Sequence, residues 1–301
     1  MKKILLIPHI EILNANALSS PYTIGFPAMT AWLGATHALQ RKLQASHYED
    51  LKFKSMAVIC HEIDLQTYKG ATDYVHSVIG TGNPLNKNGN RPSFIEEARC
   101  HLDVSLAIEC DGLGVINYDA LYEKINQIIL GHMKFAGGDS LKCGDPQLLE
   151  IDDDSSLRRL LRRLMPGHCL IERRDLMKQS MEDGQDAIDA LLDHIKVTHE
   201  CKIGDNETIT WKSTRKEKGW IVPIATGFHG ISELGIAVQQ RDPDTQHRFA
   251  ESVVTLGEFV MPYRIDNLDN MLWHYYPDLE NNLYLCQQNT SITDIQEITH
   301  G

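Results

Sequence analysis

The sequence contains no apolar run that approaches the roughly 18 residues of a membrane-spanning helix. Its first apolar stretch, residues 4–8, is too short for a signal peptide, and no small-residue cleavage site follows it. The seven cysteines include no C-x-x-C pair, which disfavours structural zinc, and an odd, widely spaced set is a poor disulfide framework. We therefore expect a cytoplasmic protein without membrane contact.

Sequence motifs of common enzyme sites are also missing. Gly112 and Gly114 lack the third glycine of a dinucleotide fingerprint, and there is no P-loop or nucleophile elbow. His61 and Glu62 are not followed by a second histidine at helical spacing, and a lone histidine is more often structural than a ligand. We expect no catalytic residues, no metal and no cofactor.

Positive charge is scarce, because 29 Lys and Arg residues stand against 41 Asp and Glu residues and give a net charge of −12. A phosphate-binding protein normally has a net positive field, so the composition by itself argues against nucleic acid as a ligand. If the protein binds RNA, it must use local basic patches. Its acidic surface would then face solvent or a basic partner.

Hydrophobic periodicity in the first half predicts an α+β body. Strands are expected at residues 4–8, 54–65, 102–108 and 133–135, and helices at 27–43 and 118–130. This β-α-β-β-α-β order is that of ferredoxin-like and RNA-recognition folds. Residues 74–99 are too long and turn-rich for core, and predict a protruding hairpin.

The second half predicts additional helices. A mixed helical excursion is expected over about 152–218, with helices at 152–164 and 185–197 and an exposed segment at 201–219. A strand is expected at 220–224 and helices at 248–260 and 268–275. We interpret residues 1–301 as a single body with insertions at about 74–100 and 152–218.

The most informative local pattern is the RRLLRRL motif inside the helix expected at 152–164. At helical spacing, Leu157, Leu160, Leu161 and Leu164 share one face, and the four arginines at 158, 159, 162 and 163 occupy the opposite arc. Four guanidinium groups over about two turns can form forked hydrogen bonds to phosphate. The alternative is a solvated face paired with acidic neighbours.

A cluster of short polar side chains follows the first strand: Asn14, Asn16, Ser19 and Ser20. Such groups can bind base edges or sugar hydroxyls, and nearby Phe26 could offer a stacking ring. The more common role of these residue types is a turn that bonds its own backbone.

Several segments resemble a known family in order over nearly the whole chain. They are residues 12–21, 25–27, 37–41, 83–86, 96–99, 136–138, 158–167, 219–224 and 256–259. They resemble the tail subunit of the type I-F CRISPR surveillance complex, of the repeat-associated RNA-binding superfamily. The resemblance implies a ferredoxin-like, RNA-recognition-like body with a thumb near residues 74–100.

The resemblance also implies a function as a non-catalytic RNA-binding subunit. Its expected partners are the five-prime handle of the CRISPR RNA, the large subunit that recognises the protospacer-adjacent motif, and a repeated backbone subunit that meets the thumb. Target DNA would be contacted only indirectly. The expected RNA-binding residues are Asn14, Asn16, Ser19, Ser20, His37, Arg41, Asn83, Arg99, Arg158, Arg159, Arg162 and Arg163.

The alternative function is a CRISPR RNA-processing endoribonuclease, since subunits of this superfamily in another subtype cut the precursor. Cleavage needs an acid or base beside a ribose 2′-hydroxyl, and the candidates are His37, His61 and Tyr68. No sequence spacing supports them as a group.

Overall fold

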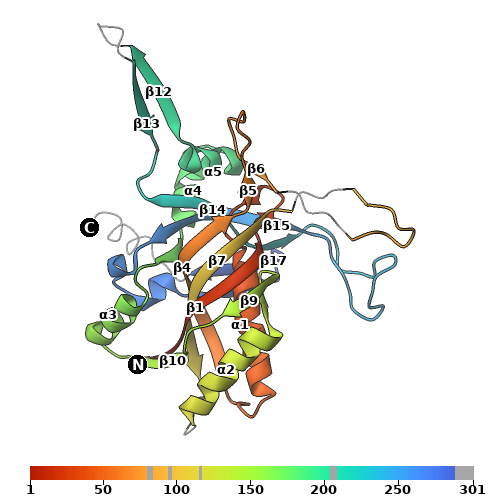
Figure 1. The fold of residues 1–301 in the computed structure, drawn as a ribbon, viewed down its shortest axis with the longest axis vertical. Helices are drawn as coiled ribbons and strands as arrows, with labels where there is room; N and C mark the ends of the chain where they lie inside the picture. Colours follow the sequence, from red (N-terminus) through yellow and green to blue (C-terminus); the bar gives the residue numbers. More distant parts are fainter. Residues whose placement is uncertain (80–83, 94–96, 115–116, 204–208, 289–301) are drawn as a thin grey trace.

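The computed structural model describes residues 1–79, 84–93, 97–114, 117–203 and 209–288. Eleven strands of this part form one antiparallel sheet (Figure 1). Across its first half the order is β4 (Lys52–Leu65), β7 (Arg99–Asp111), β1 (Lys2–Asn16), β9 (Gly138–Lys142) and β8 (Lys134–Phe135). A further strand, β10 (Gln147–Ile151), pairs with the first residues of β1. The expected strands at 4–8, 54–65 and 102–108 are confirmed but longer.

Both faces of this half-sheet are covered by helices. Helices α1 (Met29–Gln44) and α2 (Tyr118–His132) pack on one face, where Leu5 and Ile7 of β1 point. Helix α3 (Asp154–Arg163) packs on the other face, against Ile4 and Leu6. Because successive strand residues alternate between faces, burial on both sides explains the continuous apolar run at the start of β1.

The second half of the sheet continues from β4 and curls back to it. Its strands are β16 (Trp273–Asp278), β17 (Leu283–Gln288), β14 (Trp220–Gly230), β15 (Ala250–Val260) and β11 (His168–Glu172). Both β16 and β11 pair with β4, so long-range pairing closes this part of the structure.

Two expected helices are wrong. Residues 250–260 form β15, paired with β14 and β11, and residues 268–275 form the short 3₁₀ helix η2 (Leu268–Met271) and the start of β16. The β-branched run Val253, Val254 and Thr255 and the helix-disfavouring Gly257 favour a strand. A second 3₁₀ helix, η1 (Pro262–Arg264), follows β15.

The remaining elements lie outside the sheet. Helices α4 (Arg174–Glu182) and α5 (Ala187–Ile195) precede an exposed hairpin of β12 (Thr198–Ile203) and β13 (Ile209–Thr214), which projects from the body (Figure 1). In the helix expected at 185–197, Leu191 and Ile195 pack against a core cluster, whereas Ile188 and Leu192 are exposed and Ala190 and His194 are buried.

Two small strand pairs complete the structure. They are β2 (Leu18–Ser20) with β3 (Thr23–Ile24), and β5 (Thr67–Tyr68) with β6 (Ser77–Val78). The described part of the expected thumb beyond β6, residues 84–93, is irregular and exposed, and the Asn86 side chain accepts hydrogen bonds from the backbone of Asn88 and Asn90. No helix in the described ranges is long and apolar enough to cross a membrane.

Candidate nucleic-acid interface

Most of the residues expected to bind RNA lie on two separate surfaces at opposite ends of β1. The first residues of β1 pair with β10, which leads into α3, whereas Asn16 at its end pairs with Arg99. A strand of this length spans about 45 Å. The structure therefore does not bring the α3 arginines together with the Asn14–Ser20 cluster.

The surface at the end of β1 contains an open pocket of about 740 Å³, which we call the α1 pocket. It collects segments that are far apart in the chain: the end of β1, the start of α1, the start of β7 and the turn before β9. Its lining includes Asn16, Ser19, Thr30, Ala31, Arg99 and Gly137. Three of the expected RNA-binding residues thus meet in one concave site.

The first turn of α1 gives this pocket a positive electrostatic end. The N-cap residue is Ala28, which has no side chain that can cap the helix, and the first turn contains no acidic residue. In the first turn of α1 the Ala31 N–H donates to the Ala28 carbonyl at 2.9 Å, so the N–H groups of Met29 and Thr30 remain, and the helix dipole makes this end attractive to anions. The start of α1 is therefore a candidate position for a phosphate group.

The short polar side chains are mostly held by their own segment. The Asn16 side chain accepts the Leu18 N–H at 3.1 Å and donates to the Leu18 carbonyl at 3.0 Å. Ser20 is buried with its hydroxyl 2.7 Å from Thr23 Oγ1, and Ser19 Oγ lies 2.9 Å from the same atom. The ordinary turn-forming role is therefore present, and these groups form a rigid pocket wall rather than free hydrogen-bonding arms.

Arg99 brings a positive charge to this wall. Its guanidinium forms an ion pair with Glu97 and lies 3.5 Å from the Asn14 carbonyl oxygen. The opposite wall is the turn at Ala136 and Gly137, which both have positive φ. At the next residue, Gly138, an added Cβ would lie 2.8 Å from the Ala15 backbone nitrogen, so glycine lets this turn approach β1.

Helix α3 forms the second surface, and here the amphipathic pattern is confirmed. Leu157, Leu160, Leu161 and Leu164 are buried against the sheet, and all four arginines are exposed. Within the described residues, Arg163 bonds to Gln147 and none of the four forms an ion pair with a carboxylate. The four arginines thus form an exposed face without a direct ion pair in the described residues, which fits a solvated surface as well as a phosphate-binding one, and we call this surface the arginine ridge.

The other expected RNA-binding residues belong to neither surface. His37 and Arg41 are exposed one turn apart along α1, beyond the α1 pocket. Asn83 lies outside the described residues.

The endoribonuclease candidates do not form a site. His37 is on α1, Tyr68 is on β5, and His61 is on β4 beneath the loop after α3. His61 Nδ1 lies 2.7 Å from the Pro166 carbonyl, and its Nε2 lies 2.7 Å from Ser105 Oγ. Because a carbonyl only accepts, Nδ1 carries the proton, and burial lowers the pKa of His61. Both ring nitrogens are therefore occupied by the protein.

The neighbours of His61 were not predicted from the sequence, because they come from other strands. The His9 ring stacks on that of His61 with centroids 4.2 Å apart, and its Nδ1 lies 2.9 Å from Asp103 Oδ2. No group of three or more potential metal-ligating side chains is found in the part of the chain that the structure describes.

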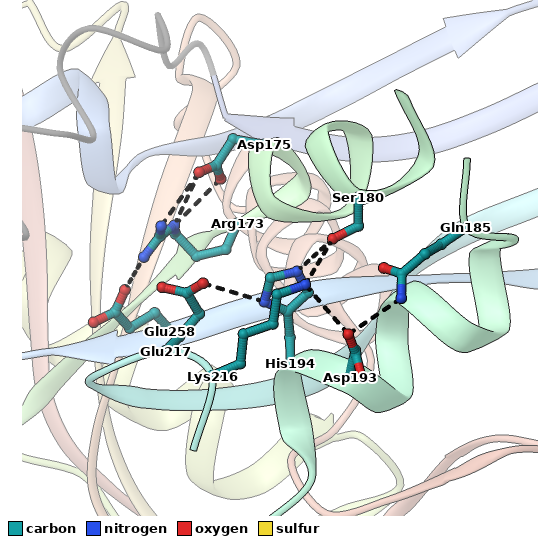
Figure 2. A network of polar contacts seen from close by, with 9 residues as sticks. All are labelled: Arg173, Asp175, Ser180, Gln185, Asp193, His194, Lys216, Glu217 and Glu258. Carbon is teal, nitrogen blue, oxygen red and sulfur yellow. Dashed lines mark hydrogen bonds and ion pairs between the residues drawn. The ribbon is translucent and has the colours of Figure 1, made fainter. Parts of the chain in front are cut away.

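A buried network near the hairpin was also missed (Figure 2). Ser180 Oγ lies 2.9 Å from His194 Nε2, and Glu217 lies 3.6 Å from His194 Nδ1, an order that resembles a hydrolase triad. However, Ser180 and His194 are each 4% exposed, and Lys216 Nζ also lies 3.2 Å from the Ser180 hydroxyl. The network instead fixes the residues after β13 against α4 and α5.

Arg173 forms a second buried contact in the same view (Figure 2). Two of its guanidinium nitrogens lie 3.2 Å from the two carboxylate oxygens of Asp175, and a third nitrogen pairs with Glu258. Glu258 is 2% exposed. Paired carboxylates on both sides identify Arg173 as a structural ion rather than a ligand-binding one.

Comparison with known proteins gives consistent matches across the chain. A family model described as CRISPR-associated protein (Cas_Csy2) matches residues 5–286. The CRISPR-associated protein Csy2 of Pseudomonas aeruginosa (strain UCBPP-PA14) is 33% identical over 310 residues, which cover 93% of this chain and 94% of that protein. The match includes the α1 pocket, the arginine ridge and the buried network. This chain therefore belongs to the Cas_Csy2 family of CRISPR-associated proteins.

Proposed function

We propose that this protein is a non-catalytic subunit of a type I-F CRISPR ribonucleoprotein, in which it binds the five-prime handle of the CRISPR RNA. It would pair there with the large subunit that recognises the protospacer-adjacent motif, and work in the cytoplasm. Target DNA would be reached through the complex. Membership of the Cas_Csy2 family supports the assignment to CRISPR defence.

The observation that carries the RNA-binding proposal is the α1 pocket. It combines an uncapped helix N-terminus, a guanidinium group and rigid amide and hydroxyl groups in about 740 Å³. A phosphate of the RNA would accept hydrogen bonds from the first N–H groups of α1 and from Arg99. Neutral main-chain donors also explain how a protein of net charge −12 could bind RNA.

The topology supports an RNA-recognition-like body. The neighbouring strands β4, β7, β1 and β9, with α1 connecting β1 to β4 and α2 following β7, have the order expected for a ferredoxin-like β-α-β-β-α-β unit. The remaining strands would be additions to that unit.

The projecting hairpin supports a contact with the large subunit. The pairs Cys201–Trp211 and Ile203–Ile209 lie on one face of it, and the two isoleucines and Trp211 are exposed. A two-stranded hairpin with an uncovered apolar face is marginal alone, and such residues are typical of interface centres. In a pull-down experiment we expect Trp211→Ser to lose the large subunit. Lys212→Ala, on the other face of the hairpin, should retain it.

The irregular exposed segment at 84–93 supports the thumb assignment. It projects from the body and contributes no buried apolar side chain within its described residues. Its partner would be the first backbone subunit. Deleting residues 84–91 should leave the subunit folded while electron micrographs of the complex become heterogeneous.

A non-catalytic role is supported by the occupied nitrogens of His61 and the inaccessible Ser180. Repeat RNA incubated with the purified protein should stay intact with and without divalent metal. Specific cleavage lost on His61→Ala would favour the endoribonuclease alternative.

The decisive experiment places one negative charge at the start of α1. Thr30→Asp should stabilise the helix slightly, because an acidic residue in the first turn favours the dipole. The same carboxylate should repel a bound phosphate. We therefore expect co-purified CRISPR RNA to fall sharply while the melting temperature stays the same or rises.

Gln127→Glu provides the control for charge, since it adds the same charge to an exposed position in the middle of α2. Because it also removes the Gln127 hydrogen bond to Glu123, its melting temperature is measured alongside. Equal RNA retention by both variants would show that RNA does not bind at the start of α1.

A further inference from the structure

A second pocket, of about 470 Å³, lies between α2 and α3 beside the arginine ridge. Its lining includes Tyr118, Tyr122, Glu150, Asp152 and Arg159, and we call it the tyrosine pocket. It adjoins β10, at the other end of β1 from the α1 pocket, and is therefore a separate site. Its volume is within the range that accommodates a small organic group.

Two tyrosine rings form one wall of this pocket. Their centroids are 6.3 Å apart with an angle of 28° between the planes. The Tyr122 hydroxyl accepts the Leu148 N–H at 2.8 Å, which fixes that ring, while Tyr118 is 38% exposed. Tyr122 is thus the fixed ring, and Tyr118, which stacks on it, is the accessible ring on which a nucleic-acid base can stack.

The other wall carries positive charge from the arginine ridge. Arg159 is exposed and forms no ion pair within the described residues. The N-terminus of α3 is already closed by the capping box of Asp153 and Ser156, so the side-chain guanidinium groups, and not the helix end, are available to an anion. Arg158 and Arg162 continue the ridge toward exposed Tyr263.

The floor of the pocket offers hydrogen-bond acceptors. The Leu148 N–H points away from β1, toward the Tyr122 hydroxyl. Backbone groups two residues apart in a strand point the same way, so the N–H and C=O of Glu150 lie at the same open edge of β10. The carboxylates of Glu150 and Asp152 are also exposed there, and that of Glu150 lies 4.0 Å from Lys3 Nζ. Such acceptors complement the exocyclic amine of adenine, cytosine or guanine better than the carbonyl oxygens of uracil.

We propose that the tyrosine pocket binds one unpaired, amine-bearing base of single-stranded RNA, with the phosphates on either side held by the arginine ridge. The base stacks on Tyr118 and donates its amine to the carboxylate floor. This proposal rests on the proposed RNA-binding function and adds a second contact point for the same strand.

The test compares two variants of the full-length protein in its complex with the large subunit. Tyr118→Leu removes the aromatic ring, whereas Tyr118→Phe keeps it. Affinity for oligocytidine should fall about 5- to 100-fold in Tyr118→Leu and be retained in Tyr118→Phe, as expected for loss of one base–aromatic stack. The wild-type complex should bind oligocytidine more tightly than oligouridine, and Asp152→Asn should narrow that difference.

Measuring Thr30→Asp with the same oligonucleotides distinguishes an error in the tyrosine-pocket proposal from an error in the proposed RNA-binding function. Weaker binding by Thr30→Asp together with unchanged binding by Tyr118→Leu would overturn the tyrosine pocket and leave the RNA-binding function intact. Absence of RNA binding by the wild-type complex would overturn both. If Tyr118→Leu instead dissociates the large subunit and leaves RNA affinity unchanged, the pocket is a protein contact and the proposal is wrong.

Discussion

The arginines of α3 and the nearby Arg173 have opposite environments. The four arginines of α3 are exposed and without ion pairs in the described structure, whereas Arg173 is 5% exposed between Asp175 and Glu258. The same guanidinium group is thus available to a ligand in one place and holds tertiary structure together in the other. The partners, and not the residue type, decide its role.

The largest effect is expected from Arg173→Ala. Removing this arginine leaves Glu258 buried without its counter-ion, which should cost about 3–5 kcal/mol of unfolding free energy. Urea denaturation followed by circular dichroism measures this loss. Replacing Glu258 as well, as Arg173→Met with Glu258→Leu, should recover part of it, because only the partly exposed Asp175 then lacks its counter-ion.

Arg174→Ala is the matched control for this prediction. Arg174 is the adjacent residue, and its side chain is 30% exposed with a 3.7 Å ion pair to Glu172. At pH 5, where Glu172 is mainly neutral, its removal should cost much less than that of Arg173. Equal losses for the two variants would contradict the distinction between buried and exposed arginines.

A somewhat smaller effect is expected from Glu172, whose ion pair in the described structure is the 3.7 Å contact with Arg174. Burial raises the pKa of Glu172 to about 7, with Arg174 only partly opposing this. The stability that neutral Glu172 contributes is therefore fully present below its pKa in the unfolded protein, near 4.5. This stability is lost as the pH rises through its pKa in the folded protein, about 7. At pH 8 the free energy of unfolding should therefore be lower by at most about 3 kcal/mol.

Glu172→Gln should remove this pH dependence, since an amide cannot ionise and can still accept the Gln288 N–H. The stability of the variant relative to wild type should therefore increase between pH 5 and pH 8. Parallel stability curves over that interval would show that Glu172 ionises as easily in the folded as in the unfolded protein.

The smallest effect on stability is expected on the arginine ridge. Arg158→Ala with Arg162→Ala should change unfolding free energy by less than about 0.5 kcal/mol, as is usual for exposed positions. If both contact RNA phosphates, the slope of log affinity against log salt should shrink by about 0.7 per contact. The loss should be similar for all RNA sequences, because phosphate contacts carry no base information.

The corresponding lysine pair, Arg158→Lys with Arg162→Lys, keeps the charge and should keep most of the salt dependence. A folded alanine variant with unchanged affinity and slope would assign the ridge to a protein partner. A variant that fails to fold would mean that the arginines contribute to packing.

Local patterns in the sequence predicted the elements whose burial follows from their own periodicity. The leucine spacing of α3 is confirmed, and so are the helices expected at 118–130 and 152–164. In contrast, β15 was predicted as a helix because its apolar residues also fit helical spacing. Only pairing with β14 and β11, two segments distant in the chain, selects the strand.

The candidate site was predictable in part. The sequence indicated Asn16, Ser19 and Arg99 as RNA-binding residues, but not that they share a pocket with the start of α1 and with Gly137. The tyrosine pocket gave no sequence signal, because Tyr118 and Arg159 are brought together by the packing of α2, α3 and β10. Neither residue forms a motif with the other along the chain.

The sequence by itself determined the family, the amphipathic α3 and the apolar strands at the centre of the sheet, because these depend on local order and composition. Only the tertiary structure decided which arginines are buried, which histidines are occupied and which polar groups meet in a pocket. The physical reason is that desolvation and ion pairing depend on neighbours supplied by distant segments. Arg173 and Arg163 are ten positions apart and look alike in the sequence, but only Arg173 folds against Glu258.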